Sequence, residues 1–151
     1  MSVLVFIETK GKISKAAKEA VTYGSKIGTT TVVTFGDADA AALASIGDNG
    51  ATKILVCRSL SEGNDQQLTK LIAAAANDCG ADVIIVSQDQ LGKAIAPRVA
   101  ANLEAGHVSG AIALPDTSNG FVVKTNVFSG KAFANVSIDV LRTEQGTGFQ
   151  G

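Results

Sequence analysis

The chain is poor in the residues that build metal and redox centres. Its 151 residues include only two cysteines, Cys57 and Cys79, and one histidine, His107. The cysteines form no Cys-x-x-Cys pair, so we interpret them as reduced, buried side chains rather than as a disulfide or a metal site. A single histidine cannot build a histidine-rich metal site. We expect His107 to be a surface or capping residue near a glycine-flanked turn rather than a base.

Charge is also scarce. Asp, Glu, Lys and Arg make up 18% of the residues, the net charge is −1, and Lys and Arg form no run. A near-neutral chain gives no electrostatic reason to expect a nucleic-acid or anionic-membrane partner. The opening apolar run, residues 3–7, is too short for a signal h-region or a membrane span. We therefore expect a cytoplasmic protein.

The common nucleotide-binding and catalytic motifs are missing. The loop at residues 8–12 has one glycine, so it is not a G-x-G-x-x-G loop, and each Gly-Lys pair lacks the Ser or Thr of a P-loop. No G-x-S-x-G elbow occurs, and the glycine spacing of an ATP-binding universal stress domain is absent as well. Glu8 and Asp89 follow predicted strands, but we interpret them as solvated loop residues. The sequence thus predicts no catalytic residue and no metal ligand.

Hydrophobic residues, in contrast, make up 46% of the chain, enough for the core of one domain. Short runs rich in Val and Ile alternate with helical patterns, and such continuously apolar strands are typical of a parallel sheet covered on both faces. The alternation predicts a three-layer α/β fold, an open, mostly parallel twisted sheet with helices on both faces. The expected strands are residues 3–7, 31–35, 54–57, 83–87 and 111–114, and the expected helices are residues 13–27, 38–46, 68–79 (ended by Gly80) and 95–103.

The last third of the sequence has a different pattern. Residues 121–128 form a strand candidate, and residues 134–140 alternate apolar and polar side chains with a period of two. We expect these two segments to form an antiparallel pair at the edge of the parallel sheet. Residues 1–142 would then form one domain. Residues 143–151 contain three glycines and no periodicity, which fits either a floppy terminus or a linker.

One stretch near the fourth strand carries more specific information. Pro97 damages a helix interior but is tolerated in a first turn, so we expect the helix to begin about there. Gly92 and Lys93 would then lie in the preceding loop, and Lys93 and Arg98 would lie near a helix N-terminus, where they could attract an anion or a partner's carboxylate. The alternative interpretation is that Gly92 only permits a tight turn and Arg98 only faces water.

The same stretch resembles the electron-transfer flavoprotein alpha subunit family. Its members share the Gly92-Lys93 pair, residues 96–101 (Ala-Pro-Arg-Val-Ala-Ala), and the Leu, Ala-Gly and Val-Ser of residues 103–109. Residues 2–8 are similar to the family's first strand, and residues 128–136 resemble its Tyr-Ala-Gly-Lys-Ala strand pair. The chain departs from the family at Gly110, where Asp is frequent, and at residues 124–125, where Arg-Pro is frequent.

The resemblance implies a scaffold domain within a larger assembly. In this family the alpha subunit pairs with a beta subunit, and FAD lies mostly on a second, C-terminal alpha domain whose motifs do not occur here. Residues 143–151 would lead towards that missing flavin domain. We therefore expect no FAD on this chain and assign it no cofactor-binding residue. Gly92, Lys93, Arg98 and Lys131 are candidates for an interface with the beta subunit or the flavin domain.

The resemblance also implies a function and leaves alternatives to it. The family carries electrons from dehydrogenases to a quinone reductase or another acceptor and is not itself enzymatic. The alternative function is a stand-alone nucleotide-binding module of the universal-stress type. A small α/β hydrolase is a third interpretation, which the single histidine and the missing nucleophile motif disfavour.

Overall fold

The computed structural model describes residues 2–8, 13, 15–36, 40–58, 64–86, 90–103, 106–108, 122–127, 132–137 and 148–150; for residues 90–93 and from residue 106 onward it describes the backbone only. Its elements in chain order are β1 (Ser2–Phe6), α1 (Lys15–Ser25), β2 (Thr29–Phe35), α2 (Ala40–Asp48), β3 (Lys53–Cys57), α3 (Asp65–Cys79), β4 (Val83–Val86), α4 (Gln90–Asn102), β5 (Gly106–Val108), β6 (Val122–Val127), β7 (Ala132–Ser137) and β8 (Gly148–Gln150).

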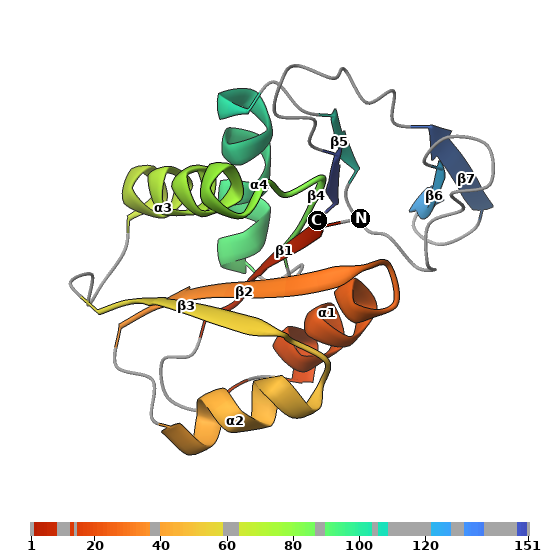
Figure 1. Cartoon of the computed structure of the whole chain (residues 1–151). Coiled ribbons are helices and arrows are strands. Elements are labelled where there is room, and N and C mark those ends of the chain that lie inside the picture. The colour runs from red at the N-terminus through yellow and green to blue at the C-terminus, as the bar shows by residue number, and fades with distance from the viewer. Residues whose placement is uncertain are drawn as a thin grey trace.

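A parallel sheet with strand order β3-β2-β1-β4-β8-β5 forms the centre of the fold. Helices cover it on both sides, with α1 and α2 on one face and α3 and α4 on the other (Figure 1). The predicted three-layer α/β fold is therefore confirmed. The chain moves outward from β1 through β2 to β3, and then returns to place β4 on the other side of β1. The order thus reverses between β1 and β4, which makes this point the topological switch of the sheet.

The apolar strands form these layers because each of them supplies both faces of the sheet. In β1, Val3 and Val5 pack into the core under α1 and α2, whereas Leu4 and Phe6 pack into the core under α3 and α4. All four side chains are buried. Side chains alternate between the two faces of a strand, so a strand buried on both faces needs an unbroken apolar run. The sequence of β1 meets that requirement.

Helix α3 begins and ends where its sequence directs. The Asn64 side chain accepts a hydrogen bond from the Gln67 amide at 2.9 Å, and the Gln67 side chain accepts one from the Asn64 amide at 3.4 Å. This reciprocal pair is a capping box, which satisfies two amides that the first turn leaves without partners. Gly80 ends the helix with a φ of 63°, a left-handed conformation that glycine adopts without a steric cost. The predicted stop at Gly80 is confirmed.

The predicted start of the fourth helix is wrong. Helix α4 begins at Gln90, and Pro97 lies inside it rather than in its first turn. The expected segment of residues 95–103 already placed Ile95, Val99 and Leu103 on one face, and in the structure all three are buried in the core against α3. Pro97 itself is exposed, so its ring does not displace a core side chain, and only one amide is lost from the helix. Tertiary packing thus overrides the local preference of proline.

The C-terminal segments differ from the expectation in several ways. Strands β6 and β7 pair antiparallel, as predicted, but they form their own two-stranded sheet, and among the described strands neither pairs with the edge of the parallel sheet. The expected strand at residues 111–114 lies outside the described residues. Gly148–Gln150, expected in a tail or linker, forms β8 between β4 and β5. His107 lies in β5 opposite Phe149 rather than at a turn.

Candidate functional site

The carboxyl end of the sheet at the switch between β1 and β4 is the place where open α/β folds bind ligands. Strand β1 is held there by the Ile7 amide, which donates to the Val33 carbonyl oxygen at 3.2 Å. Glu8 follows and is half-buried, and Ile13 returns to the core beside Ala17. Helix α1 then starts at Lys15. The connection from β1 to α1 is therefore tied to the core at both described ends.

The neighbouring end of β2 is occupied by contacts within the protein. The Gly36 amide, the first one after β2, donates to the Cys57 carbonyl oxygen at 3.0 Å. The rings of Phe6 and Phe35 stack with their centroids 6.2 Å apart and their planes at 3°. Both rings are buried, so the pair belongs to the core and offers no open face to a ligand. The end of β2 is therefore apolar and closed by contacts within the core.

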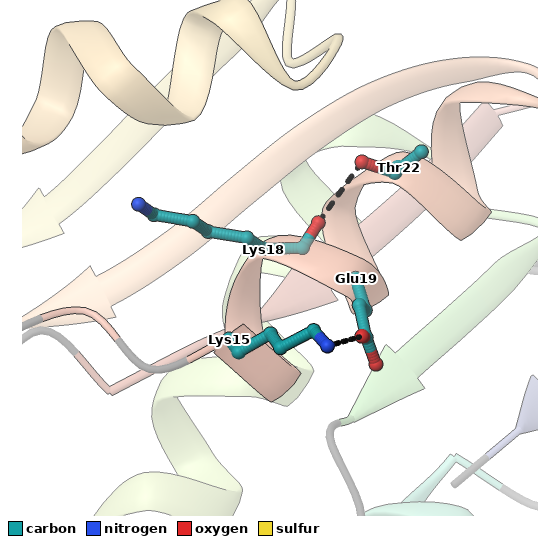
Figure 2. A network of polar contacts seen from close by, with 4 residues as sticks. All are labelled: Lys15, Lys18, Glu19 and Thr22. Carbon is teal, nitrogen blue, oxygen red and sulfur yellow. Dashed lines mark hydrogen bonds and ion pairs between the residues drawn. The ribbon is translucent and has the colours of Figure 1, made fainter.

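The first turns of α1 bring basic side chains to the same edge of the sheet. Lys15 Nζ lies 3.8 Å from Glu19 Oε1, and the Thr22 hydroxyl donates to the Lys18 carbonyl oxygen at 3.1 Å (Figure 2). The Lys15 and Glu19 side chains are 91% and 67% exposed, so this ion pair contributes little stability. No acidic residue lies in the first turn. Lys15 therefore adds to the positive end of the helix dipole. The sequence interpretation missed this feature, although a lysine at each end of the first turn signals it.

The predicted interface residues that the structure describes lie at different points along α4. Gly92 and Lys93 lie in the first turn of α4, directly after β4, rather than in a loop. They therefore share the carboxyl end of the sheet with the start of α1. Arg98 is exposed and lies eight residues beyond Gln90, about 12 Å along the axis at about 1.5 Å per residue. The expectation that Arg98 lies near a helix N-terminus is thus wrong, because the helix starts earlier than predicted. Lys131 and Asp89 lie outside the described residues.

The cysteines and acidic residues offer little for catalysis. Cys57 and Cys79 are reduced thiols and only half-buried, not fully buried as expected, because they pack at the margin of the core under α3 and α4. Burial raises the pKa of the Cys79 thiol, which makes it a poor nucleophile. Among the described residues, no group of three or more His, Cys, Asp and Glu side chains could hold a metal ion. Within the same part of the chain, no helix has the length and apolarity needed to cross a membrane.

Comparison with known families decides what this arrangement belongs to. The family described as the electron transfer flavoprotein domain matches residues 3–141. The chain belongs to the electron transfer flavoprotein domain family. The match runs from β1 to beyond β7, so it includes both helix layers and the antiparallel pair. The comparison with curated proteins gave no match. The family membership inferred from residues 92–109 is confirmed, and the chain is thus a member of a family of electron-carrying flavoproteins.

Proposed function

We propose that this chain is the N-terminal scaffold and interaction domain of an electron-transfer flavoprotein alpha subunit. In this role it is part of a complex that passes electrons from flavin dehydrogenases to an acceptor. The family match over residues 3–141 carries the proposal. The choice of the alpha subunit is supported by the pattern at residues 92–109, which lies in α4 and at the start of β5. The domain is an electron-carrier component and supplies no catalytic residue of its own.

The described residues at the ends of β1 and β2, beside the switch point, offer no site for the pyrophosphate of a flavin dinucleotide. A dinucleotide needs free backbone amides and a glycine-rich turn against its pyrophosphate. The Gly36 amide is already bonded to Cys57, and Glu8 places a half-buried carboxylate beside β1, where a phosphate would be repelled. We therefore assign FAD to a separate C-terminal domain of the full-length complex and assign this chain no part in holding it.

The outer face of α4 is the surface we assign to the interface. Ala94, Pro97, Arg98 and Ala101 are all exposed on it, while the opposite side of the helix is buried against α3 and the sheet. Small side chains let a partner approach closely, and the arginine offers several hydrogen-bond donors to a carboxylate. Lys93 and Lys131 are further candidates for the same contact. The partner is the beta subunit or the flavin domain.

The proposal is tested by binding between the purified chain and the beta subunit from the same genome. Isothermal titration should show one-to-one binding, and the chain alone should be folded and colourless. Arg98→Glu should weaken binding about tenfold or more, because it reverses a charge within the contact. Lys70→Glu makes the same charge change on the exposed face of α3 and should have no effect. Failure of the two proteins to bind, or stoichiometric flavin absorbance of the chain alone, would contradict the proposal.

A nucleotide-binding module is the second candidate function. It is favoured by one observation, the basic start of α1 beside the topological switch point. Thermal unfolding with AMP, ATP and FAD separates the two functions. A ligand at about 100 times its Kd stabilises the folded state by about 2.7 kcal/mol. A shift of that size with ATP would support the module, whereas no shift with any of the three supports the scaffold.

A further inference from the structure

The turn that follows α2 holds the residue pair Asn49 and Gly50. The sequence contains a second Asn-Gly pair, residues 119–120, which lies outside the described residues. In an Asn-Gly pair the backbone nitrogen of the glycine reaches the side-chain carbonyl group of the asparagine easily, because glycine has no side chain to obstruct the approach. The way the fold holds Asn49 and Gly50 therefore decides whether these two groups react.

The fold requires the glycine of this pair. Gly50 has a φ of 112°, in the region that favours glycine, and a methyl group there would lie 2.5 Å from Ser25 Cβ at the end of α1. Any larger residue at position 50 would thus be strained and would also push the turn away from α1. The close approach of the turn to α1 therefore keeps a glycine directly after Asn49.

The side chain of Asn49 connects the turn to both helices. Its Nδ2 donates to the Ser45 carbonyl oxygen of α2 at 2.9 Å, and its Oδ1 lies 3.3 Å from the Thr22 hydroxyl of α1. That hydroxyl has a single proton, which it shares with the Lys18 carbonyl oxygen at 3.1 Å, so its bond to Oδ1 is the weaker contact. Asn49 is therefore held mainly by the N–H group of its side-chain amide.

The hydrogen bonds of the turn also hold back a reaction between the two residues. The Gly50 amide donates to the Gly47 carbonyl oxygen at 3.0 Å, and the Asn49 amide donates to the Ile46 carbonyl oxygen at 3.0 Å. To attack Asn49 Cγ, the Gly50 nitrogen must turn towards it and lose its proton, and both changes break the bond to Gly47. The folded turn thus protects Asn49, and the reaction requires the end of α2 to open.

Helix α2 is well suited to such local opening. Ile46 is its only buried residue, whereas α1 has four buried residues and α3 has six. A helix of nine residues is also too short to be stable without its packing against the rest of the protein. Segments with few buried apolar contacts open at a lower free energy than the whole domain unfolds. We therefore expect α2 to open while the rest of the fold stays intact.

We propose that Asn49 is a site of spontaneous deamidation whose rate is set by the local opening of α2. In the open turn the deprotonated Gly50 nitrogen forms a bond to Asn49 Cγ, the bond between Cγ and Nδ2 breaks, and Nδ2 leaves as ammonia. Water then opens the resulting cyclic imide at one of its two carbonyl groups, which leaves aspartate or isoaspartate at position 49. The reaction needs only water and no enzyme, oxidant or reductant.

The product weakens the contact that protected the asparagine. A carboxylate has no N–H group to donate, so one of its oxygens would face the Ser45 carbonyl oxygen in the place of Nδ2. The new negative charge also lies just beyond the C-terminus of α2, where the helix dipole disfavours it. Deamidation at Asn49 therefore releases the end of α2 from the turn, and it acts in one direction only.

The test follows deamidation in the full chain by mass spectrometry of the peptide that contains Asn49, which separates asparagine from aspartate and isoaspartate. In the folded chain the reaction should be at least about tenfold slower than in the chain unfolded in urea. Ile46→Val loosens the buried anchor of α2 and should speed the reaction of the folded chain about fivefold. Ile72→Val makes the same change in the core under α3 and should alter the rate by less than about twofold.

Hydrogen exchange tests the opening and its consequence separately. In the wild-type chain the amides of α2 should be at least about tenfold less protected than those of α1. Asn49→Asp, which reproduces the aspartate product, should speed exchange in α2 about threefold or more. Asn77→Asp makes the same charge change at an exposed position in the last turn of α3 and should leave exchange in α2 unchanged.

Several outcomes would overturn the proposal. Equal rates in the folded and the unfolded chain would show that the bonds of the turn do not protect Asn49. Equal acceleration by Ile46→Val and Ile72→Val would show that the reaction requires global unfolding, and no acceleration by Ile46→Val would show that the folded turn reacts without opening. If Ile46→Val does not fold, equal protection of α1 and α2 in the wild-type chain refutes the local opening. Unchanged exchange in Asn49→Asp would contradict the release of α2.

Discussion

Replacing Gly24 by alanine tests how closely α1 packs on the sheet. Gly24 is the penultimate residue of α1 and is buried. A methyl group at this position would lie 2.9 Å from Val5 Cγ2 and 3.2 Å from Val3 Cγ1. Both valines are fully buried in β1, and β-branched side chains have little rotamer freedom, so they cannot easily move aside. Glycine is therefore required here by the close approach of helix and sheet.

Two opposing effects set the size of the change. Alanine is favoured over glycine in a helix by about 1 kcal/mol, which would stabilise the variant. Inserting a methyl group into a filled core costs about 1–3 kcal/mol, because side chains and backbone must shift. We expect the packing cost to exceed the helix gain. Gly24→Ala should therefore lower the free energy of unfolding by about 1 kcal/mol.

Gly47→Ala is the matched control. Gly47 is also the penultimate residue of its helix, α2, but a methyl group there would meet nothing within 4 Å. This variant should gain stability by about 0.5–1 kcal/mol. Urea denaturation followed by circular dichroism measures both changes, and a difference of 1 kcal/mol shifts Tm by about 2–4 °C. If Gly24→Ala were stabilised as much as Gly47→Ala, the close contact between α1 and β1 would be refuted.

Three further substitutions test other parts of the fold. Asn64→Ala removes the capping box and should lower the free energy of unfolding by about 1 kcal/mol in urea denaturation, whereas Asn77→Ala on the exposed side of α3 should change it by less than about 0.5 kcal/mol. Pro97→Ala restores an amide inside α4 and should raise Tm, with a gain of about 2 kcal/mol; a fall in Tm would contradict a helix that continues through this residue. Burial raises the pKa of the Cys79 thiol above 9.0, so the folded state keeps this proton when the unfolded state releases it. The free energy of unfolding should therefore fall as the pH rises past about 9, and Cys79→Ala should lose this part of the slope in urea denaturation at a series of pH values.

The helices show which helix ends the local sequence determines and which it does not. Helix α3 was predictable at its C-terminus because Gly80 marks it, and its start is encoded just as locally by Asn64 and Gln67. The buried face of α4 was predictable, but its start was not, because Pro97 locally favours a helix start near itself whereas the helix, packed against α3, continues through this residue. The same error changed the interpretation of the site, since it placed Arg98 near a helix end and Gly92 in a loop. Local preference decides an element only where packing does not oppose it.

The candidate site was less predictable than the fold. Single-sequence patterns identify strands but not which of them are neighbours, so the switch point between β1 and β4 came only from the topology. Lys15 looks like an ordinary surface lysine in the sequence. Its position beside the switch point gives it meaning. No sequence period could supply this position, because it depends on the order of the strands.

The sequence by itself determined the layers of this protein. Its unbroken apolar strands can be buried only between two layers of helices, and the pattern at residues 92–109 indicated the family that residues 3–141 confirm. The tertiary structure decided the order of the strands, the start of α4 and the place of Gly148–Gln150 between β4 and β5. Those features depend on contacts between residues far apart in the chain. A segment as short as Gly148–Gln150 has no local pattern that could specify such contacts.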